Sequence, residues 1–151
     1  MRDRRARGYR RGSDQRRTIL VASASPSLRH ILVELLDDAG NRVLAIDAAP
    51  ALIAHLRDSS RIDLVITDTR IGGMPGWQVM AAWEVVQEVK ARRPGTPVLQ
   101  LIDSRADAVP NLACPENPVT VLQKPVLVAE LLEIVKWLCP QPAPPGPHVV
   151  R

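Results

Sequence analysis

The stretch Asp63-Leu64-Val65-Ile66-Thr67-Asp68-Thr69-Arg70-Ile71-Gly72-Gly73-Met74-Pro75-Gly76 decides the fold of this chain. A short apolar run, rich in β-branched residues, ends at Asp68 and is followed by a loop rich in Gly and Pro. Such runs are typical of strands that are buried on both faces of a parallel sheet. In open α/β sheets the functional crevice lies beyond the carboxyl ends of the strands, which is where we expect Asp68. A simpler interpretation is that Asp68 only caps a turn before the next helix.

Outside this stretch, strand and helix patterns alternate along the chain. The predicted strands cover residues 18–22, 43–46, 63–68, 98–102 and 119–122. The predicted helices run from Leu28 to Ala39, onward from Pro50, from Trp77 to Arg92 and from Val126 to Leu138, with room for only a turn or two within 103–120. Five repeats of this alternation predict one α/β domain over residues 18–139, with a five-stranded parallel sheet and helices on both faces. The flavodoxin-like strand order 2-1-3-4-5 is one standard solution for such a sheet, and it is the order we expect.

The basic residues are concentrated at one end of the chain. Residues 1–17 contain eight Arg and two Asp, whereas the rest of the 151 residues has a small acidic excess. The segment 1–17 is low in apolar residues and is predicted to be a disordered tail, and the Pro-rich segment 140–151 is predicted to be a second tail. Three interpretations of residues 1–17 remain open: a solvated tail, an arm that binds nucleic acid or acidic lipid, and a start codon placed too early. Tyr9 is its only aromatic residue, which gives little support for stacking on bases.

The remaining composition predicts a soluble cytoplasmic protein. No apolar run approaches the roughly 18 residues of a membrane-spanning helix, and the Arg-rich start lacks the apolar segment of a secretory signal. Cys114 and Cys139 have no metal-binding or redox spacing and are interpreted as reduced thiols. No Gly-rich phosphate loop opens the first helix, which disfavours a nucleotide-binding version of the fold.

The loop after Asp68 resembles the phosphoacceptor loop of response-regulator receiver domains (CheY-like domains), which follows the pattern D-x-x-M-P-x-M-x-G. Asp68, Met74 and Gly76 have the spacing of that pattern, while Ile71 and Gly72 stand where Met and Pro are usual. The resemblance extends over roughly residues 18 to 139. It implies a two-component or phosphorelay signalling module, with Asp68 as the candidate phosphoacceptor.

The resemblance also implies a role for Lys124, which is followed by Pro125 as in the family. Lys124 would be the cation that binds the phosphoryl oxygens, or the ion-pair partner of Asp68. Phosphorylation of an aspartate requires Mg²⁺ to relieve repulsion between a phosphoryl dianion and a carboxylate. In receivers an acidic pair at the end of the first strand helps to bind this ion. Ser23 and Ala24 occupy those two positions here, so only a weak residual metal site at Asp68 is expected.

Two further positions depart from the receiver pattern. Ile102 stands where the fourth strand normally ends in Thr or Ser, and Asp103 follows it in place of a small residue. Val121 replaces the aromatic switch residue of the fifth strand. With these departures we expect Asp68 and Lys124 to form a direct ion pair, with no metal and no other cofactor; Mg²⁺ would be needed only if the protein is phosphorylated.

Three hypotheses of function follow. The first is a degenerate stand-alone receiver that binds a signalling protein, such as a histidine kinase, a phosphotransfer protein or a downstream effector, with little or no phosphorylation. The second is a working single-domain response regulator that catalyses its own phosphorylation on Asp68; apart from this reaction, no enzyme activity is expected. The third is a nucleic-acid or anionic-surface binder that acts through residues 1–17.

Overall fold

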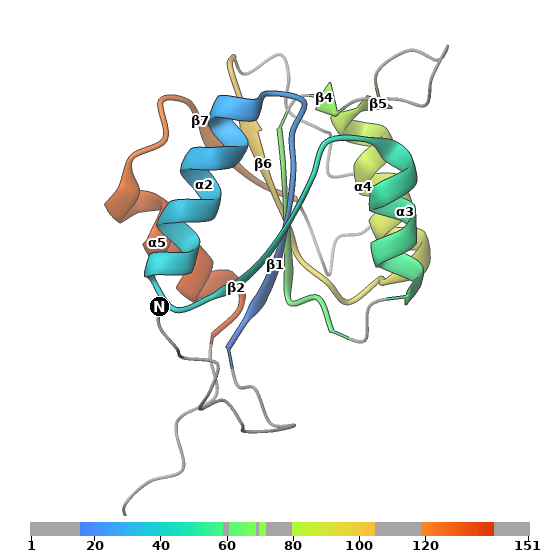
Figure 1. Ribbon diagram of the computed structural model, residues 1–151, viewed down its shortest axis with the longest axis horizontal. Coiled ribbons are helices and arrows are strands. Elements are labelled where there is room, and N and C mark those ends of the chain that lie inside the picture. The colour runs from blue at the N-terminus through green and yellow to red at the C-terminus, as the bar shows by residue number, and fades with distance from the viewer. Residues whose placement is uncertain (1–15, 59–60, 69, 72–79, 105–118, 141–151) are drawn as a thin grey trace, which may run out of the picture.

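A parallel sheet with helices on both faces forms the body of the protein (Figure 1). The computed structural model describes residues 16–58, 61–68, 70–71, 80–104 and 119–140. The strands of the sheet are β1 (Thr18–Ala22), β2 (Arg42–Ile46), β3 (Leu64–Thr67), β6 (Val98–Ile102) and β7 (Thr120–Gln123). They pair in parallel in the order β2-β1-β3-β6-β7, which confirms the order 2-1-3-4-5 predicted from the sequence.

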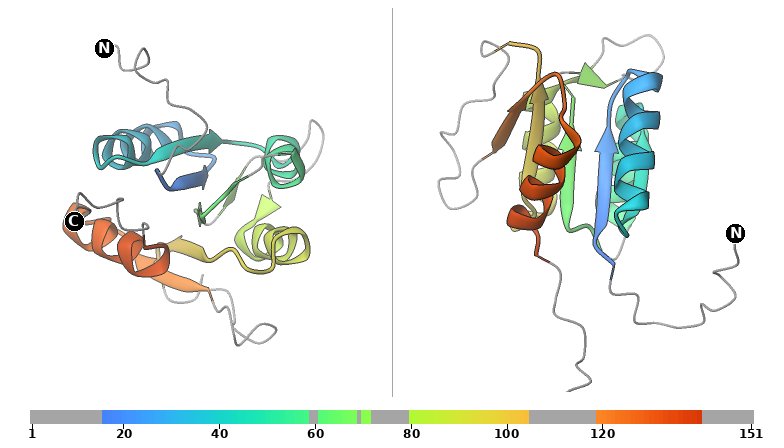
Figure 2. Two further views of the ribbon diagram at one scale, coloured as in Figure 1. Left: turned by 90° about the horizontal axis from the view of Figure 1, so that it is seen from below. Right: turned by 90° about the vertical axis from the view of Figure 1, so that its left-hand side faces the viewer.

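Two layers of helices cover the sheet (Figures 1 and 2). The helices are α2 (Pro26–Asp38), α3 (Ala49–Asp58), α4 (Ala82–Arg92) and α5 (Val128–Leu138). Helices α2 and α5 lie on one face, and α3 and α4 lie on the other. Successive residues of β1 explain why both faces need a cover: Ile19 and Val21 belong to the core under α2 and α5, and Leu20 belongs to the core under α3 and α4.

Local sequence signals fix the ends of α2. Its N-cap is Ser25, whose Oγ accepts a hydrogen bond of 3.2 Å from the backbone N–H of Leu28, and Pro26 occupies the first turn. After the helix, Gly40 has a φ of 91°, a left-handed conformation that glycine adopts at little cost. The chain can therefore turn sharply from α2 into β2.

Helix α4 begins later than the sequence pattern predicts. The expected start at Trp77 is wrong, because Met80 and Ala81 form a short strand, β5 (Met80–Ala81), before the helix begins at Ala82. This strand pairs antiparallel with β4 (Arg70–Ile71), in the segment that follows Asp68. The pairing offers the backbone an alternative to helical hydrogen bonds, which helical periodicity alone does not reveal.

The folded body includes a residue just before β1. Arg17, which the sequence pattern assigns to the tail, is buried and 7% exposed. Its Nε donates a 2.9 Å hydrogen bond to Asn41 Oδ1, and its Nη1 donates one of 3.3 Å to the carbonyl of Cys139. Arg17 therefore joins the start of β1 to the end of α5 and is part of the folded body.

Other expectations fall outside the described residues. These are the tail up to residue 15, the turn or short helix expected within 105–118 together with Cys114, and the Pro-rich segment from 141 onward. Within the part of the chain that is described, no helix is both long enough and apolar enough to cross a membrane.

Candidate functional site

Asp68 lies immediately after β3, at the carboxyl end of the sheet. Its backbone N–H donates a 2.9 Å hydrogen bond to the carbonyl of Ala22, the last residue of β1, so the two strand ends are held side by side. The residue is 8% exposed. Both carboxylate oxygens contact side chains that follow other strands of the sheet, which a role limited to capping a local turn does not account for.

Lys124 follows β7 and reaches the same carboxylate. Its Nζ donates a 2.7 Å hydrogen bond to Asp68 Oδ1 and lies 3.4 Å from Asp103 Oδ1. Burial acts to lower the pKa of Lys124, but hydrogen bonding and the negative charges of Asp68 and Asp103 outweigh it and raise the pKa. Lys124 is therefore a cation at neutral pH, shared between two carboxylates of unequal exposure.

Ser23 contacts Asp68 from the end of β1. Its Oγ donates a 2.9 Å hydrogen bond to Asp68 Oδ2 and accepts one of 3.0 Å from the backbone N–H of Ser25. On α2, Arg29 Nη1 donates a 2.7 Å hydrogen bond to the carbonyl of Ser23. The hydroxyl thus fills one side of Asp68, and a guanidinium holds the loop that carries this hydroxyl.

Three further positions that depart from the receiver pattern are Ala24, Ile102 and Val121, which lie at or near the ends of three strands. Ala24 is exposed beside Ser23. Ile102, at the end of β6, is only 2% exposed and lies in the apolar interior. Val121 is partly buried on β7, where it pairs with Gln100. The structure therefore brings together the side chains of Asp68, Lys124 and Ser23.

Two contacts of the site escape the sequence reasoning: the Ser23–Asp68 hydrogen bond and the Arg29 contact with the Ser23 carbonyl. The first follows from the strand register, because Ala22 pairs with Thr67 and the next residues along, Ser23 and Asp68, become neighbours. The contact of Arg29 with the Ser23 carbonyl depends on the direction in which α2 leaves the loop, which only the structure gives. Arg29 is six residues beyond Ser23, and no spacing rule predicts that its side chain turns back.

Carboxylates at the carboxyl end of the sheet are the natural candidates for a metal site. Among the described residues, no group of three or more His, Cys, Asp and Glu side chains is placed to hold a metal ion. Of the two carboxylates near Lys124, Asp68 already contacts Ser23, and Asp103 is two-thirds exposed. A hard cation such as Mg²⁺ requires about six oxygen ligands in near-octahedral geometry.

Comparison with known proteins identifies the family that this fold and site define. Residues 19–136 match the response regulator receiver domain, so the chain belongs to this family. It is 33% identical over 118 residues to the sensory/regulatory protein RpfC of Xanthomonas campestris pv. campestris, strain 8004. That alignment covers 76% of this chain but only 15% of RpfC, so the chain spans a small part of its relative.

Solved structures with the same fold are also similar in sequence. A response regulator receiver protein from Sinorhizobium medicae is 26% identical, with a TM-score of 0.66 over 83% of this chain and 96% of the other. A receiver domain protein from Clostridium thermocellum is 25% identical, with a TM-score of 0.66 over 81% and 93% of the two chains. The resemblance seen in the Asp68 loop and at Lys124-Pro125 thus extends to the whole domain, which is a two-component signalling module.

Proposed function

We propose that this protein is a degenerate receiver that signals by binding a partner protein, with little or no Mg²⁺-dependent phosphorylation of Asp68. The observation that carries the proposal is the environment of one carboxylate. Asp68 Oδ1 contacts Lys124 and Asp68 Oδ2 accepts the hydrogen bond of Ser23. Both oxygens that would bind a metal or attack a phosphoryl group already have a protein partner.

The residues present fit Mg²⁺ poorly, which supports the proposal. Ser23 and Ala24 offer one neutral hydroxyl and one methyl group at the positions of the acidic pair. A neutral oxygen supplies none of the negative charge that favours binding of a divalent cation. Lys124 instead places a positive charge 2.7 Å from Asp68, where it satisfies the carboxylate without metal.

The residues that would surround an incoming phosphoryl group also disfavour phosphorylation of Asp68. Ile102 has no hydroxyl with which to hydrogen-bond a phosphoryl oxygen, and Asp103 adds a carboxylate beside Lys124. Like charges at such distances repel, so Asp103 opposes the approach of a dianion. Binding partners of the proposed module are the proteins that receivers serve: a histidine kinase, a phosphotransfer protein or a downstream effector.

A working receiver is the second candidate, and one observation favours it. Asp68 and Lys124 are in contact at the carboxyl end of the sheet, the arrangement that an acceptor and its phosphoryl-binding cation require. In this alternative an oxygen of Asp68 attacks the phosphorus of a small acyl phosphate, the bond from phosphorus to the donor oxygen breaks, and the donor leaves as a carboxylate. The products are an aspartyl phosphate and the free carboxylate.

Incubation with Mg²⁺ and a small acyl phosphate tests the two candidates. Intact-protein mass spectrometry should detect no added phosphoryl group, with Asp68→Asn as the matched control. A phosphoryl group found on the parent protein but absent from Asp68→Asn would overturn the proposal that the receiver is degenerate. An addition that persists in Asp68→Asn would place the modification elsewhere and leave Asp68 without an acceptor role.

A further inference from the structure

One edge of the five-stranded sheet is formed by β2, which crosses the view of Figure 1 in front of the other strands. Among the described strands β2 pairs with β1 alone, and the pairing continues in register from Arg42 to Ile46. Natural proteins commonly protect an edge strand from further pairing with a charged residue, a proline or a bulge. The run from Val43 to Ile46 contains no charged residue, no proline and no bulge. Nothing within the strand therefore opposes the addition of another strand.

The backbone of β2 has hydrogen-bonding groups on its outer side. The N–H of Arg42 donates a 2.8 Å hydrogen bond to the carbonyl of Arg17, on the side of β1. Because successive residues of a strand direct their N–H and C=O groups to opposite sides, every second residue from Arg42 onward faces β1. The N–H and C=O groups of Val43 and Ala45 therefore point away from the sheet. Among the described residues these groups have no hydrogen-bond partner.

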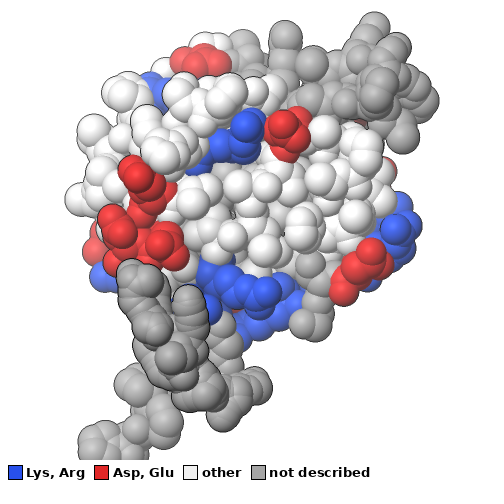
Figure 3. Space-filling model, viewed as in Figure 1, with Lys and Arg blue, Asp and Glu red and all other residues white. Residues whose placement is uncertain are grey.

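The side chains along this edge are uncharged between two charges of opposite sign. Val43 and Leu44 are half-buried, and Ala45 is exposed. Arg42 opens the strand and Asp47 follows its last residue, and both of these residues are exposed. Figure 3, which has the view of Figure 1, shows a broad uncharged area across the middle of this face, with charged side chains around its margin. The edge thus combines an apolar centre with one basic and one acidic end.

We propose that β2 pairs antiparallel with β2 of a second copy of this chain, so that the two sheets join at their edges about a twofold axis. In this pairing Leu44 lies opposite Leu44 of the second copy, and Val43 lies opposite Ala45 of the second copy. Directly opposite residues of an antiparallel ladder can exchange both of their N–H···O=C hydrogen bonds. Each Val43 and Ala45 pair does so here, which satisfies the outward backbone groups of both copies.

The charges at the two ends of β2 select both the partner and the direction of pairing. In an antiparallel pair the start of one strand lies beside the end of the other, so Arg42 of each copy lies beside Asp47 of the other copy. Parallel pairing would instead place like charges together at both ends. Opposite charges on paired strands stabilise a sheet, and like charges destabilise it. A second copy therefore supplies the charge order that the antiparallel arrangement requires.

This pairing goes beyond the proposed receiver function and leaves the Asp68 site accessible. Strand β1 lies between β2 and β3, and Asp68 follows β3 at the carboxyl end of the sheet. Asp68→Asn should therefore leave self-association unchanged. One strand from each copy makes a small contact for a protein–protein interface, so the dimer should be weak and should form only as the protein concentration rises.

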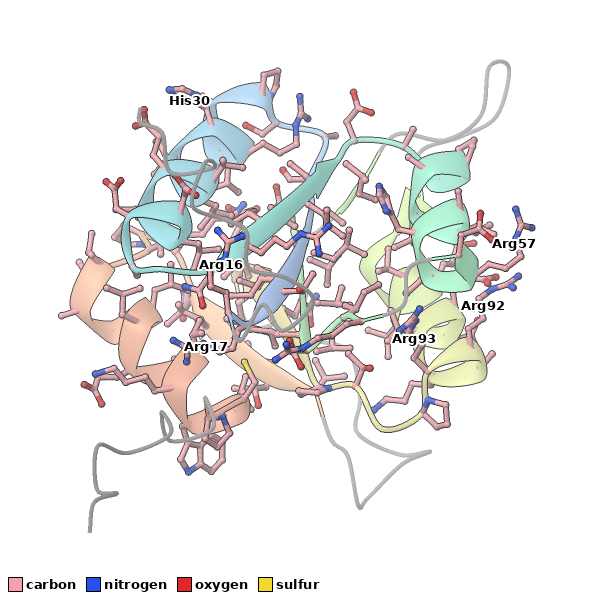
Figure 4. The ribbon with its side chains drawn as sticks, turned by 60° about the horizontal axis from the view of Figure 1, so that its bottom comes forward. Arg16, Arg17, His30, Arg57, Arg92 and Arg93 are labelled. Atoms are coloured by element: carbon pink, nitrogen blue, oxygen red, sulfur yellow. The ribbon has the colours of Figure 1, made fainter. Side chains whose placement is uncertain are left out.

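Sedimentation velocity of the full-length protein at several concentrations tests the pairing. The sedimentation coefficient should rise with concentration from the value of a monomer to that of a dimer. Arg42→Glu and Asp47→Arg, made singly, should each raise the dissociation constant about tenfold, because each replaces two attractive contacts with repulsive ones. The control of matched net charge is Arg92→Glu, which should leave the dissociation constant unchanged. Arg92 pairs with Glu88 on α4, and Figure 4 shows it on the outer side of that helix.

Mixing the two charge variants distinguishes the antiparallel pairing from other contacts between copies. In a mixed dimer of Arg42→Glu with Asp47→Arg, both charge contacts again join opposite signs. The equal mixture should therefore associate about as tightly as the parent protein, and so should the double variant that carries both changes. Association that stays weak in the mixture and in the double variant would overturn the antiparallel arrangement. So would single variants that both associate as the Arg92→Glu control does.

The backbone contacts have a separate test. Ala45→Pro removes an outward N–H without removing a hydrogen bond to β1, and it should abolish the dimer at concentrations where the parent dimerises. In the parent, amide hydrogen exchange at Val43 and Ala45 should slow as the concentration rises. A protein that stays monomeric at every concentration, or a dimer whose Val43 and Ala45 amides exchange as fast as in the monomer, would overturn the proposal. Thermal melting at a concentration where the parent is monomeric verifies that each variant keeps its fold.

Discussion

Ser23 Oγ donates a 2.9 Å hydrogen bond to Asp68 Oδ2, at the place where receivers carry an acidic residue. A carboxylate there would repel Asp68 unless a cation lay between them, whereas the hydroxyl stabilises it directly. Together with the 2.7 Å contact from Lys124, this hydrogen bond makes Asp68 a satisfied part of the folded structure.

The Asp68–Lys124 ion pair should contribute measurably to stability. Lys124→Met should lower the free energy of unfolding by about 2 kcal/mol, because it leaves the nearly buried Asp68 carboxylate without its cation. In an Asp68→Asn background the same change should cost well under half as much. Urea unfolding of the four proteins measures the coupling.

A second pair on α5 provides the control for this cycle. Lys136 Nζ lies 3.8 Å from Glu133 Oε2, and both side chains are about two-thirds or more exposed. Its coupling should be no more than about 0.5 kcal/mol. Equal coupling energies for the two pairs would show that the Asp68–Lys124 contact has no special importance for stability.

Restoring the receiver pattern should create a response to magnesium. Ser23→Asp, Ala24→Asp and Ile102→Thr together restore the two carboxylates and the hydroxyl that receivers carry at these positions. Without metal the triple variant should melt below the parent protein, because the new carboxylates crowd Asp68 and the Ser23 hydrogen bond is lost.

Magnesium should then stabilise the variant and not the parent. A ligand at about one hundred times its dissociation constant adds about 2.7 kcal/mol to the stability of the folded state. Thermal melting with Mg²⁺ and with a chelator measures the difference. A parent protein that is itself stabilised by Mg²⁺ would contradict the proposal that the receiver is degenerate. A triple variant that Mg²⁺ does not stabilise would indicate that Asp103 and Lys124 still block the site.

Cys139 should make stability depend on alkaline pH. Burial raises the pKa of its thiol to about 11, above the value of about 8.5 for an unfolded chain. The folded state therefore holds this proton longer than the unfolded state, so the contribution is fully present below pH 8.5 and is lost as the pH rises toward 11. Between pH 8.5 and pH 10 the loss should be about 1–2 kcal/mol.

Cys139→Ala isolates this dependence, since it removes the ionisable thiol and should flatten the slope of stability against pH over that range. Urea unfolding at several pH values measures both proteins. Lys124, whose pKa is also raised, contributes stability that is lost only at still higher pH, so the chosen range separates the two groups. Equal slopes for parent and variant would assign the pH dependence to another group.

Arg17 should be essential to the packing of the N-terminal end of the sheet. Arg17→Met should lower the free energy of unfolding by about 1–3 kcal/mol, because Asn41 Oδ1 and the carbonyl of Cys139 lose a buried donor. The neighbouring exposed Arg42 provides the control, and Arg42→Gln should change stability by less than about 0.5 kcal/mol. Similar losses in both variants, measured by thermal melting, would mean that Arg17 acts through charge rather than through its buried contacts.

The sequence by itself determined the architecture. Apolar runs buried on both sides of the sheet, alternating with helical periodicity, leave few solutions other than a parallel sheet between two layers of helices, and the observed strand order is one standard form of it. The position of Asp68 at the carboxyl end of a central strand was equally predictable, because strand direction places every strand exit at the same end. These features depend on residue type and order, which the sequence states directly.

Only the tertiary structure decided which residues distant in sequence pair or form hydrogen bonds with one another. The start of α4 at Ala82 depends on the pairing of β5 with β4, and the inclusion of Arg17 in the body depends on acceptors at Asn41 and Cys139. The hydrogen bond from Ser23 to Asp68 likewise requires two strand ends to be in register. Ser23 and Asp68 are 45 residues apart in the sequence, and their contact depends on distance and direction in space. No local sequence pattern specifies such a contact.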